Sequence, residues 1–292
     1  MSMRDFDFVE PASVSEACTL LAEDPEGSLV FAGGTDILVD LKADLRRPGR
    51  LVSLGRIPEL EGIEIGDDGR LTIGAMTTVN RIARDEGVKK RFPGINDAAM
   101  SLAAEQVRNQ ATIAGNLCMA VPSADMAPIL LAHGAAMRVI SPEGERLIPL
   151  REFFVGPRQT VLDPADIVVA IEVPAPVPGT GASSIRQGGR VSLSLPMASA
   201  ATVVVMDGKV CREATVALGA VAPIPIVARE AGDAVVGREL TEETLNEAAE
   251  LAAAAATPID DIRATKEYRL ELVKVLTRRA FRAAETRAED QL

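Results

Sequence analysis

Two short glycine-containing stretches constrain the fold of this chain more than any other feature. The first, FAGGTDI, covers residues 31–37 and follows a strand-like apolar run over residues 28–31. The second, ATIAGNLCMAVPSAD, begins with a strand-like piece at residues 111–113 and leads into an apolar helix-like segment over residues 126–132. Glycine lets the backbone approach a bulky group closely, and successive N–H groups at a turn present partial positive charge to an anion. Both stretches therefore have the character of anion-binding turns.

Either stretch alone has a simpler interpretation, a tight connection in which glycine supplies a positive φ without any ligand. Two such stretches at strand-to-helix transitions of one domain favour a shared cofactor that carries a diphosphate. Asn116 and Asp125 in the second stretch add side-chain groups suited to bonding sugar hydroxyls. The sequence thus predicts a diphosphate cofactor held between two loops.

The composition excludes several classes of protein. A length of 292 residues indicates two domains, and the formal charge of −11 argues against nucleic acid and anionic membrane surfaces as partners. No apolar run approaches the ~18 residues that span a bilayer. The first residues, MSMRDFDFVEPAS, lack the apolar core of a signal peptide. We therefore expect a cytoplasmic protein without a membrane span.

The chain is poor in residues that hold metals or act as nucleophiles. Cys18, Cys118 and Cys211 stand far apart in the sequence, and His133 is the single histidine. A metal site or an iron–sulfur cluster held by this chain alone is therefore not expected, and neither is Ser/His or Cys/His hydrolase chemistry. We interpret Cys118 as a packing residue and His133 as a helix C-terminal residue favoured by the helix dipole. Redox chemistry would require a bound cofactor.

Local signals predict several helix starts. Ser13 and Glu16 form a capping-box pattern that starts a helix at Val14. Thr35 or Asp36 is placed to cap the helix after the first glycine stretch. Because a carboxylate repels a phosphate, we expect the Asp36 side chain to cap this helix while its N–H faces the anion.

A break in composition divides the chain at residues 174–182, where PAPVPGTGA is typical of a linker. After the break, strand-like runs precede helix-like runs over residues 242–256 and 265–288, the first capped by Thr241. We expect a first domain with two sub-lobes and a second domain of strands backed by helices. The predicted bounds are residues 1–176 for the first domain and 177–292 for the second.

Several fragments in a fixed order resemble one known family over nearly the whole chain. The fragments are FDFVEPASVSEA, FAGGTDILV, IGAMTTV, QVRNQATIAGN, PSADMAPILLAHGA, IVVAIEVP, VALGAVAPIPIVA and YRLELVKVLTRRA. Together they resemble the FAD-binding (medium) subunits of molybdenum hydroxylases, a family that includes carbon monoxide dehydrogenase and xanthine dehydrogenase. The resemblance implies an α+β fold, with a vanillyl-alcohol-oxidase-like (PCMH-type) two-lobed FAD-binding domain followed by a C-terminal domain of antiparallel strands backed by helices. It places the two sub-lobes of the first domain at about residues 1–54 and 55–176.

The resemblance also implies a site for noncovalent FAD, with no catalytic residue for the substrate in this chain. The family's pyrophosphate loop matches Ala32, Gly33, Gly34, Thr35 and Asp36, and its second flavin loop matches Thr112, Ile113, Ala114, Gly115 and Asn116. Further matches are the acidic Asp125, the aliphatic Ile167 or its neighbour Val168, and the basic Arg186, where relatives often have lysine. Ala114 departs from the glycine of many relatives, and it fits only if its φ stays negative or the flavin does not press against its Cβ.

The function that the resemblance implies is that of an electron-exit subunit. A large partner subunit with the molybdenum cofactor would oxidise the substrate, and a small partner subunit with two [2Fe–2S] clusters would pass electrons to the FAD. The flavin would hand them to NAD⁺, a quinone or oxygen, and the assembly would be a dimer of heterotrimers. In that role the chain positions the flavin and tunes its potential.

Two other functions stay open on the sequence alone. A stand-alone flavin oxidoreductase, such as a reductase of the UDP-N-acetylenolpyruvylglucosamine type, needs its own proton donor near the flavin, and the sequence offers no convincing one. A non-enzymatic binding module would use both glycine stretches as plain turns. Bound flavin in the purified protein would exclude the module, and consumption of NADPH by the isolated chain would favour the reductase.

Overall fold

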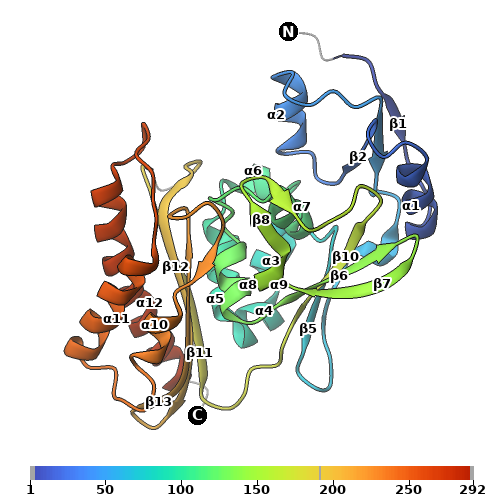
Figure 1. The fold of residues 1–292 in the computed structure, drawn as a ribbon. Helices are drawn as coiled ribbons and strands as arrows, with labels where there is room; N and C mark the ends of the chain where they lie inside the picture. The colour runs from blue at the N-terminus through green and yellow to red at the C-terminus, as the bar shows by residue number, and fades with distance from the viewer. Residues whose placement is uncertain (1–3, 191, 290–292) are drawn as a thin grey trace.

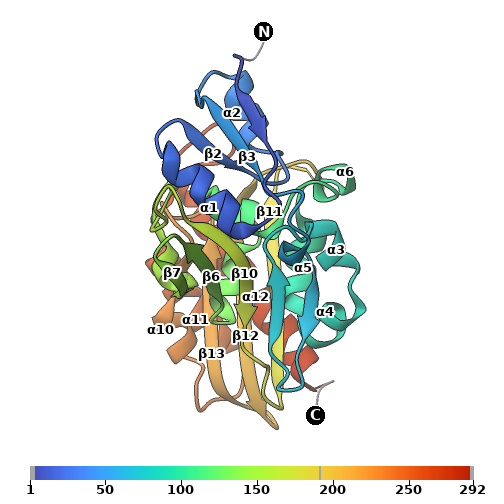
Figure 2. The same ribbon diagram turned by 90° about the vertical axis from the view of Figure 1, so that its right-hand side faces the viewer.

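The computed structural model describes residues 4–190 and 192–289, and it arranges them as successive layers of sheets and helices (Figures 1 and 2). We name three parts by residue number: the N-terminal lobe (4–54), the middle lobe (55–176) and the C-terminal layer (177–289). In Figure 1 the N-terminal lobe stands at the upper right, the middle lobe lies in the centre and the C-terminal layer forms the left side. The predicted α+β fold is confirmed.

The N-terminal lobe is a small parallel sheet with helical crossovers. Its strands lie in the order β1-β3-β2, and both neighbouring pairs are parallel. Parallel neighbours require a crossover, which helices supply here. The elements are β1 (Asp7–Val9), α1 (Val14–Glu23), β2 (Ser28–Phe31), α2 (Ile37–Lys42) and β3 (Arg50–Ser53). Helix α1 begins at Val14 as predicted, because Ser13 Oγ accepts the Glu16 N–H at 3.2 Å.

The middle lobe is built on a five-stranded antiparallel sheet of order β4-β5-β10-β6-β7. The bounds are β4 (Ile63–Ile65), β5 (Leu71–Gly74), β6 (Ala136–Ser141), β7 (Gly144–Pro149) and β10 (Ile167–Val173). Strand β10 is central and all seven of its residues are buried, which explains its β-branched composition. A short hairpin of β8 (Phe154–Gly156) and β9 (Gln159–Thr160) follows α9 (Leu150–Phe153).

A run of short helices connects β5 to β6 and covers the sheet. The run comprises α3 (Val79–Arg84), α4 (Glu86–Arg91), α5 (Pro93–Ser101), α6 (Glu105–Arg108), α7 (Ile113–Cys118) and α8 (Ala127–Ala132), and a 3-10 turn η1 (Pro58–Leu60) precedes β4. Ile82, Ile95 and Ile129 from these helices pack with Ile73 of β5 in one buried cluster. The apolar helix predicted before His133 is confirmed as α8.

The C-terminal layer is a four-stranded antiparallel sheet backed by helices. Its strands follow chain order: β11 (Thr180–Gly188), β12 (Pro196–Asp207), β13 (Val210–Gly219) and β14 (Ile226–Val227). Helices α10 (Arg229–Asp233), α11 (Glu242–Ala255) and α12 (Lys266–Glu289) complete it. The predicted linker is shorter than expected, because Thr180 already pairs with Val205 and belongs to β11.

The four-stranded sheet is shared between two cores. Ala200 and Val204 of β12 face the cluster formed with α11 and α12, whereas Ala201 between them belongs to the cluster of the middle lobe. Ala182 and Ala217 join Ala201 there, on the face covered by α5 and α8. In Figure 1 this sheet accordingly stands between two sets of helices. The C-terminal layer and the middle lobe therefore pack as one body.

The interpretation of residues 111–113 as a strand is wrong. Thr112 forms only an isolated bridge with Thr78, and Ile113 is the first residue of α7. Thr112 is the N-cap of this helix, since its Oγ1 accepts the Gly115 N–H at 3.1 Å. The capping threonine, rather than the apolar pattern around it, decides the local structure.

His133 lies at the C-cap of α8, as predicted, but its electrostatic interpretation is wrong. The ring packs edge-on against Phe92, with centroids 5.9 Å apart, and Nε2 is buried without a hydrogen-bond partner among the described residues. Burial lowers the pKa of His133 to about 4, so the ring is neutral near pH 7. The residue contributes packing instead of a positive charge at the helix end.

Within the part of the chain that the structure describes, no helix has both the length and the apolar character to cross a membrane.

Candidate functional site

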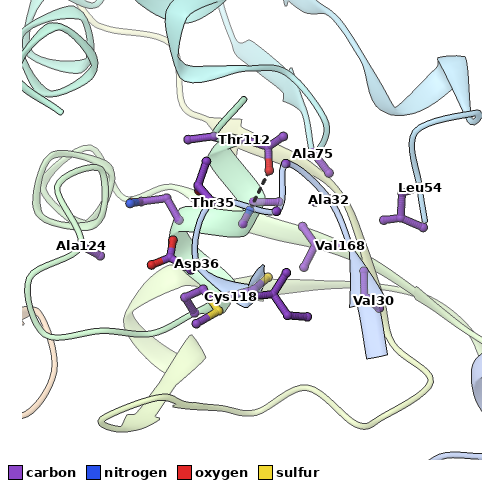
Figure 3. Close-up of a pocket in the computed structure, with 18 of the residues that line it drawn as sticks. Val30, Ala32, Thr35, Asp36, Leu54, Ala75, Thr112, Cys118, Ala124 and Val168 are labelled. Atoms are coloured by element: carbon purple, nitrogen blue, oxygen red, sulfur yellow. Dashed lines mark hydrogen bonds between the residues drawn. The ribbon is translucent and has the colours of Figure 1, made fainter. Parts of the chain in front are cut away.

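A cavity of about 550 Å³ lies where the N-terminal lobe meets the middle lobe (Figure 3). Val30, Ala32 and Leu54 line it from the N-terminal lobe, while Ala75 and Val168 line it from the middle lobe. Its volume falls within the ~300–1,000 Å³ typical of sites for small molecules and cofactors. Both glycine stretches reach this cavity, so the two predicted loops belong to one site.

The first glycine stretch carries unpaired backbone donors at the cavity wall. Gly34 has φ +76°, a conformation that favours glycine, and it turns the chain between β2 and α2. Among the hydrogen bonds of the described residues, none uses the N–H of Gly33, Gly34, Thr35 or Asp36 as donor. Gly34 is buried and Gly33 and Thr35 are half-buried, and N–H groups in such places normally have partners. Together with the N–H of the exposed Asp36, these unpaired donors indicate a site for an acceptor-rich ligand.

Asp36 occupies the N-cap position of α2, but its side chain makes no capping hydrogen bond, so that prediction is wrong. The physical reason is its backbone: φ −102° and ψ −48° are helical, whereas a capping side chain needs an extended residue. The pKa of Asp36 is raised, chiefly because the carboxyl is desolvated by burial, and Arg158 opposes this while Asp40 adds to it. The structure thus leaves a carboxylate beside the unpaired donors.

The second stretch contributes differently from the first. The backbone donors at the start of α7 are engaged inside the chain: Ile113 N–H with Thr77 O at 3.1 Å and Ala114 N–H with Ala75 O at 3.3 Å. The Gly115 N–H binds the Thr112 hydroxyl, and the Asn116 N–H binds Thr112 O at 3.0 Å. The expectation that both loops offer bare main chain is therefore wrong for the start of α7, whereas further along the second stretch the N–H groups of Val121, Ser123 and Asp125 donate no hydrogen bond among the described residues. Ala114 lies within α7 and has no positive φ, so its Cβ is accommodated.

The two stretches touch directly. A Cβ built on Gly33 would stand 1.8 Å from the carbonyl oxygen of Gln110 and 3.3 Å from the Cα of Ala111. Only glycine permits this approach, which joins the N-terminal lobe to the entrance of α7. In Figure 3, Thr35 and Thr112 accordingly lie on neighbouring parts of the cavity wall.

Asp125 and Arg186 form an ion pair at the far end of the second stretch. Arg186 Nη1 donates to Asp125 Oδ1 at 2.8 Å, and the two side chains are only 9% and 10% exposed. Burial raises the pKa of Asp125 to about 6, although Arg186 acts in the opposite direction. Asn116 Oδ1 accepts the Met126 N–H at 3.2 Å and so helps to hold the start of α8. The C-terminal layer therefore contacts the lining residue Asp125 through Arg186, and its own Leu195 lines the cavity.

Most of the predicted site residues line the cavity. They are Ala32, Gly33, Gly34, Thr35, Asp36, Thr112, Ala114, Gly115, Asn116, Asp125 and Ile167, and the expected neighbour Val168 lines it as well. Ile113 is fully buried in the middle-lobe core, so the structure does not bring its side chain to the cavity. Arg186 is absent from the lining and bonds to Asp125 behind it. Their roles toward a cofactor stay predictions.

Sequence reasoning missed three charged residues near the first loop. Arg46 lines the cavity, and Asp40 of α2 lies between Arg46 and Arg158 in two ion pairs. Arg158 is 118 positions from Asp40, and no local pattern connects them. The half-buried Cys118 lines the cavity as well, and desolvation raises the pKa of its thiol to about 12, so it is a thiol and a poor nucleophile at neutral pH. Among the described residues, no group of three His, Cys, Asp or Glu side chains forms a metal site.

Comparisons with known proteins cover almost the whole chain. Residues 4–176 match the family described as FAD binding domain in molybdopterin dehydrogenase, and residues 183–284 match the CO dehydrogenase flavoprotein C-terminal domain. The carbon monoxide dehydrogenase medium chain of Afipia carboxidovorans is 34% identical over 98% of both chains. The xanthine dehydrogenase FAD-binding subunit of Escherichia coli O157:H7 is 32% identical over 98% of this chain and 99% of its own.

A solved structure agrees with these matches. One chain of reconstituted CO dehydrogenase from Oligotropha carboxidovorans superposes with a TM-score of 0.95 and 32% identity, covering 98% of this chain and 100% of that chain. Likeness over the full length, including the C-terminal layer, favours a dehydrogenase subunit over a stand-alone reductase or a non-enzymatic module. The resemblance seen in the sequence is thereby confirmed. The chain belongs to the family of FAD-binding medium subunits of molybdenum-containing dehydrogenases.

Proposed function

We propose that the cavity between the N-terminal and middle lobes holds FAD noncovalently, with the diphosphate at the loop of residues 33–36. The single observation that carries this assignment is the row of four consecutive backbone N–H groups without acceptors, in residues that line a cavity of suitable volume. Ile167 and Val168 supply an aliphatic surface for the ring system, while Asp125 and Asn116 supply polar groups for the sugar chain. The high pKa of the Cys118 thiol supports binding without a covalent link.

When bound, FAD supplies the redox chemistry, because its ring accepts electrons one or two at a time. The residues of this chain bind and orient it and limit the access of water. Apolar side chains, among them Met76, Leu102 and Val107, make up much of the lining. Such a lining restricts solvent around a flavin, and Asp125 with Arg186 places a compensated pair of charges in the wall.

We further propose that the chain works within a dimer of heterotrimers, beside a large subunit with the molybdenum cofactor and a small subunit with [2Fe–2S] clusters. The terms "medium chain" and "FAD-binding subunit" in the relatives' names support an assembly of several chains. NAD⁺ or a quinone is the proposed electron acceptor. A cytoplasmic location belongs to the proposal, and it agrees with three cysteines that are all free thiols.

The test is purification of the tagged chain from its own host under mild conditions. The expected result is a yellow complex of three polypeptides with flavin, molybdenum and iron, in a ratio near one FAD to one molybdenum and four iron atoms. Reduction of added NAD⁺ or of a quinone analogue by this complex identifies the acceptor. A lone, colourless monomer that contains neither metal and does not bind added FAD contradicts the proposal.

A further inference from the structure

One arginine connects the two lobes beside the proposed diphosphate loop. Arg158 lies between β8 and β9 in the middle lobe, and its Nη1 donates to Asp40 Oδ2 on α2 at 2.7 Å. The Asp40 side chain is only 4% exposed, so its carboxylate is held inside the protein. Arg46 Nε lies 3.5 Å from the same oxygen and is the weaker partner. The pair is therefore a contact between lobes rather than a local surface ion pair.

The backbone around Arg158 is held in an unusual conformation. Arg158 has φ +60°, and its N–H donates to the carbonyl of Ala120, which itself has φ +47°. Left-handed conformations at residues other than glycine cost of the order of 1 kcal/mol each and persist where the surroundings enforce them. Ala120 lies within the second glycine stretch. One hairpin tip thus contacts both the N-terminal lobe and the second glycine stretch.

The charges at this contact bear directly on an anionic ligand. Asp36 lines the cavity beside the unpaired donors, and Asp40 stands one helical turn further along α2. Two carboxylates so close to a diphosphate would repel it unless they are compensated. Arg158 supplies such compensation, since it opposes the rise that burial and Asp40 produce in the pKa of Asp36.

We propose that Arg158 is a positioning residue for the diphosphate of FAD: its ion pair with Asp40 fixes α2 against the middle lobe and neutralises the carboxylates beside the phosphate-binding loop. This inference rests on the proposed FAD site and adds a residue that lies outside the cavity lining. It predicts that the charge of Arg158, and not only its bulk, governs the affinity for FAD.

The experiment measures FAD affinity of the full chain by quenching of flavin fluorescence, at low and at high salt. The variants are Arg158→Gln, Arg158→Lys, Asp40→Asn and the double variant Arg158→Gln/Asp40→Asn. Arg151→Gln is the matched control, because Arg151 belongs to the same lobe, is 69% exposed and pairs only with its neighbour Glu152 in the described structure. Thermal unfolding of each apoprotein separates folding from binding.

Arg158→Gln is expected to weaken FAD binding by about tenfold or more at low salt, the size of one lost charge interaction near an anion. Added salt should reduce this loss in part, because ions reach the exposed Asp36, although they screen the buried Asp40 much less. Asp40→Asn should restore much of the affinity in the double variant, and Arg158→Lys should lose less than Arg158→Gln. Arg151→Gln should bind FAD like the unchanged protein.

Three results would overturn the inference: Arg158→Gln binding FAD like Arg151→Gln, a loss that salt does not change, or a double variant no better than Arg158→Gln. Each of these leaves the FAD site itself intact, as long as the unchanged chain binds FAD. Failure of the unchanged chain to bind FAD would instead remove the proposed function, and with it this inference. If Arg158→Gln does not fold, Arg158→Lys and Asp40→Asn still decide between charge and bulk.

Discussion

Gly33 lies so close to Gln110 that a side chain at Gly33 cannot be accommodated: its Cβ would stand 1.8 Å from the Gln110 carbonyl oxygen. The two residues belong to different lobes, and their contact brings the first glycine loop against the start of the second. The spacing of the two lobes therefore depends on residue 33 being a glycine, which has no Cβ. The atoms that this Cβ would meet belong to the backbone of Gln110 and Ala111, so no flexible side chain can move away to make room for it.

Replacement of Gly33 by alanine should separate the two loops by an ångström or more and weaken FAD binding by on the order of 100-fold. The measurement is FAD titration of the purified full chain. Gly49→Ala is a suitable control, because a Cβ there meets only Gly27 O at 3.8 Å, an ordinary contact. Equal FAD affinity of the two variants would show that the close approach does not shape the site.

The ion pair of Asp125 and Arg186 predicts a destabilisation that depends on pH. Replacing Arg186 by methionine leaves the Asp125 carboxylate buried without a partner, which should cost about 3 kcal/mol at pH 8. The pKa of Asp125 is already raised to about 6 in the folded protein, and loss of Arg186 raises it further. A carboxyl with a raised folded pKa binds more protons when folded, so its contribution to stability improves as the pH falls through that value.

Urea unfolding of the Arg186→Met variant at pH 8 and at pH 5 should therefore show a smaller loss of stability at pH 5. The double variant Arg186→Met/Asp125→Asn provides the comparison, since it lacks the titrating carboxyl. A loss that is equal at both pH values would mean that removal of Arg186 does not raise the pKa of Asp125 in the folded protein.

His133 should make the folded state sensitive to mild acid. Its pKa is lowered to about 4 by burial, whereas an unfolded histidine titrates near pH 6.5. Because the unfolded state takes up the proton first, stability should fall by about 2 kcal/mol between pH 7.5 and pH 5 on account of this residue. His133→Leu should remove that part of the pH dependence. His133 is the single histidine of the chain, so no other imidazole contributes to the difference between the two urea titrations.

Asp97 and Arg287 should couple the middle lobe to the C-terminal layer. Arg287 Nη2 donates to Asp97 Oδ1 at 2.9 Å, and the Ser184 N–H donates to Asp97 Oδ2 at 3.2 Å. A double-mutant cycle of Asp97→Ala and Arg287→Ala should give a coupling free energy of about 1 kcal/mol or more. The exposed pair of Arg212 and Asp207 should give less than about 0.5 kcal/mol by the same measurement. A coupling free energy no larger than that of the exposed pair would show that Asp97 and Arg287 do not couple the middle lobe to the C-terminal layer.

Local patterns in the sequence predict the secondary structure correctly where that structure depends on residues within one segment. The helices that begin at Val14 and Glu242, and the buried strand β10, follow from capping residues and β-branched composition that stand side by side in the chain. The position of both glycine stretches in one cavity follows from the family resemblance together with their strand-to-helix context. The resemblance had to supply Ile167 and Arg186, for which no local signal exists.

The predictions that failed, and the residues that were missed, depended mainly on contacts with residues distant in sequence. Ile113 begins a helix because the adjacent Thr112 caps it, and a distant contact holds this helix start in place, since the Ile113 N–H donates to Thr77 O, 36 positions earlier. Likewise, His133 is neutral because Phe92 and the surrounding core exclude water, which its helix-end position does not reveal. Arg158 and Asp40 pair across 118 positions. The difference between the first loop, with four open donors in a row, and the start of α7, where the donors are engaged, appears only when each backbone N–H is matched to its acceptor.

The sharing of Ala182, Ala201 and Ala217 with the middle-lobe core bears on how such a chain can be divided. If the chain were divided near residue 177, the surfaces of α5 and α8 that pack against the four-stranded sheet would become exposed to water. Neither fragment is then an autonomous folding unit, and the flavin-carrying half made alone should aggregate or recruit chaperones. Co-expression of the two halves, by contrast, offers a route to a functional split protein.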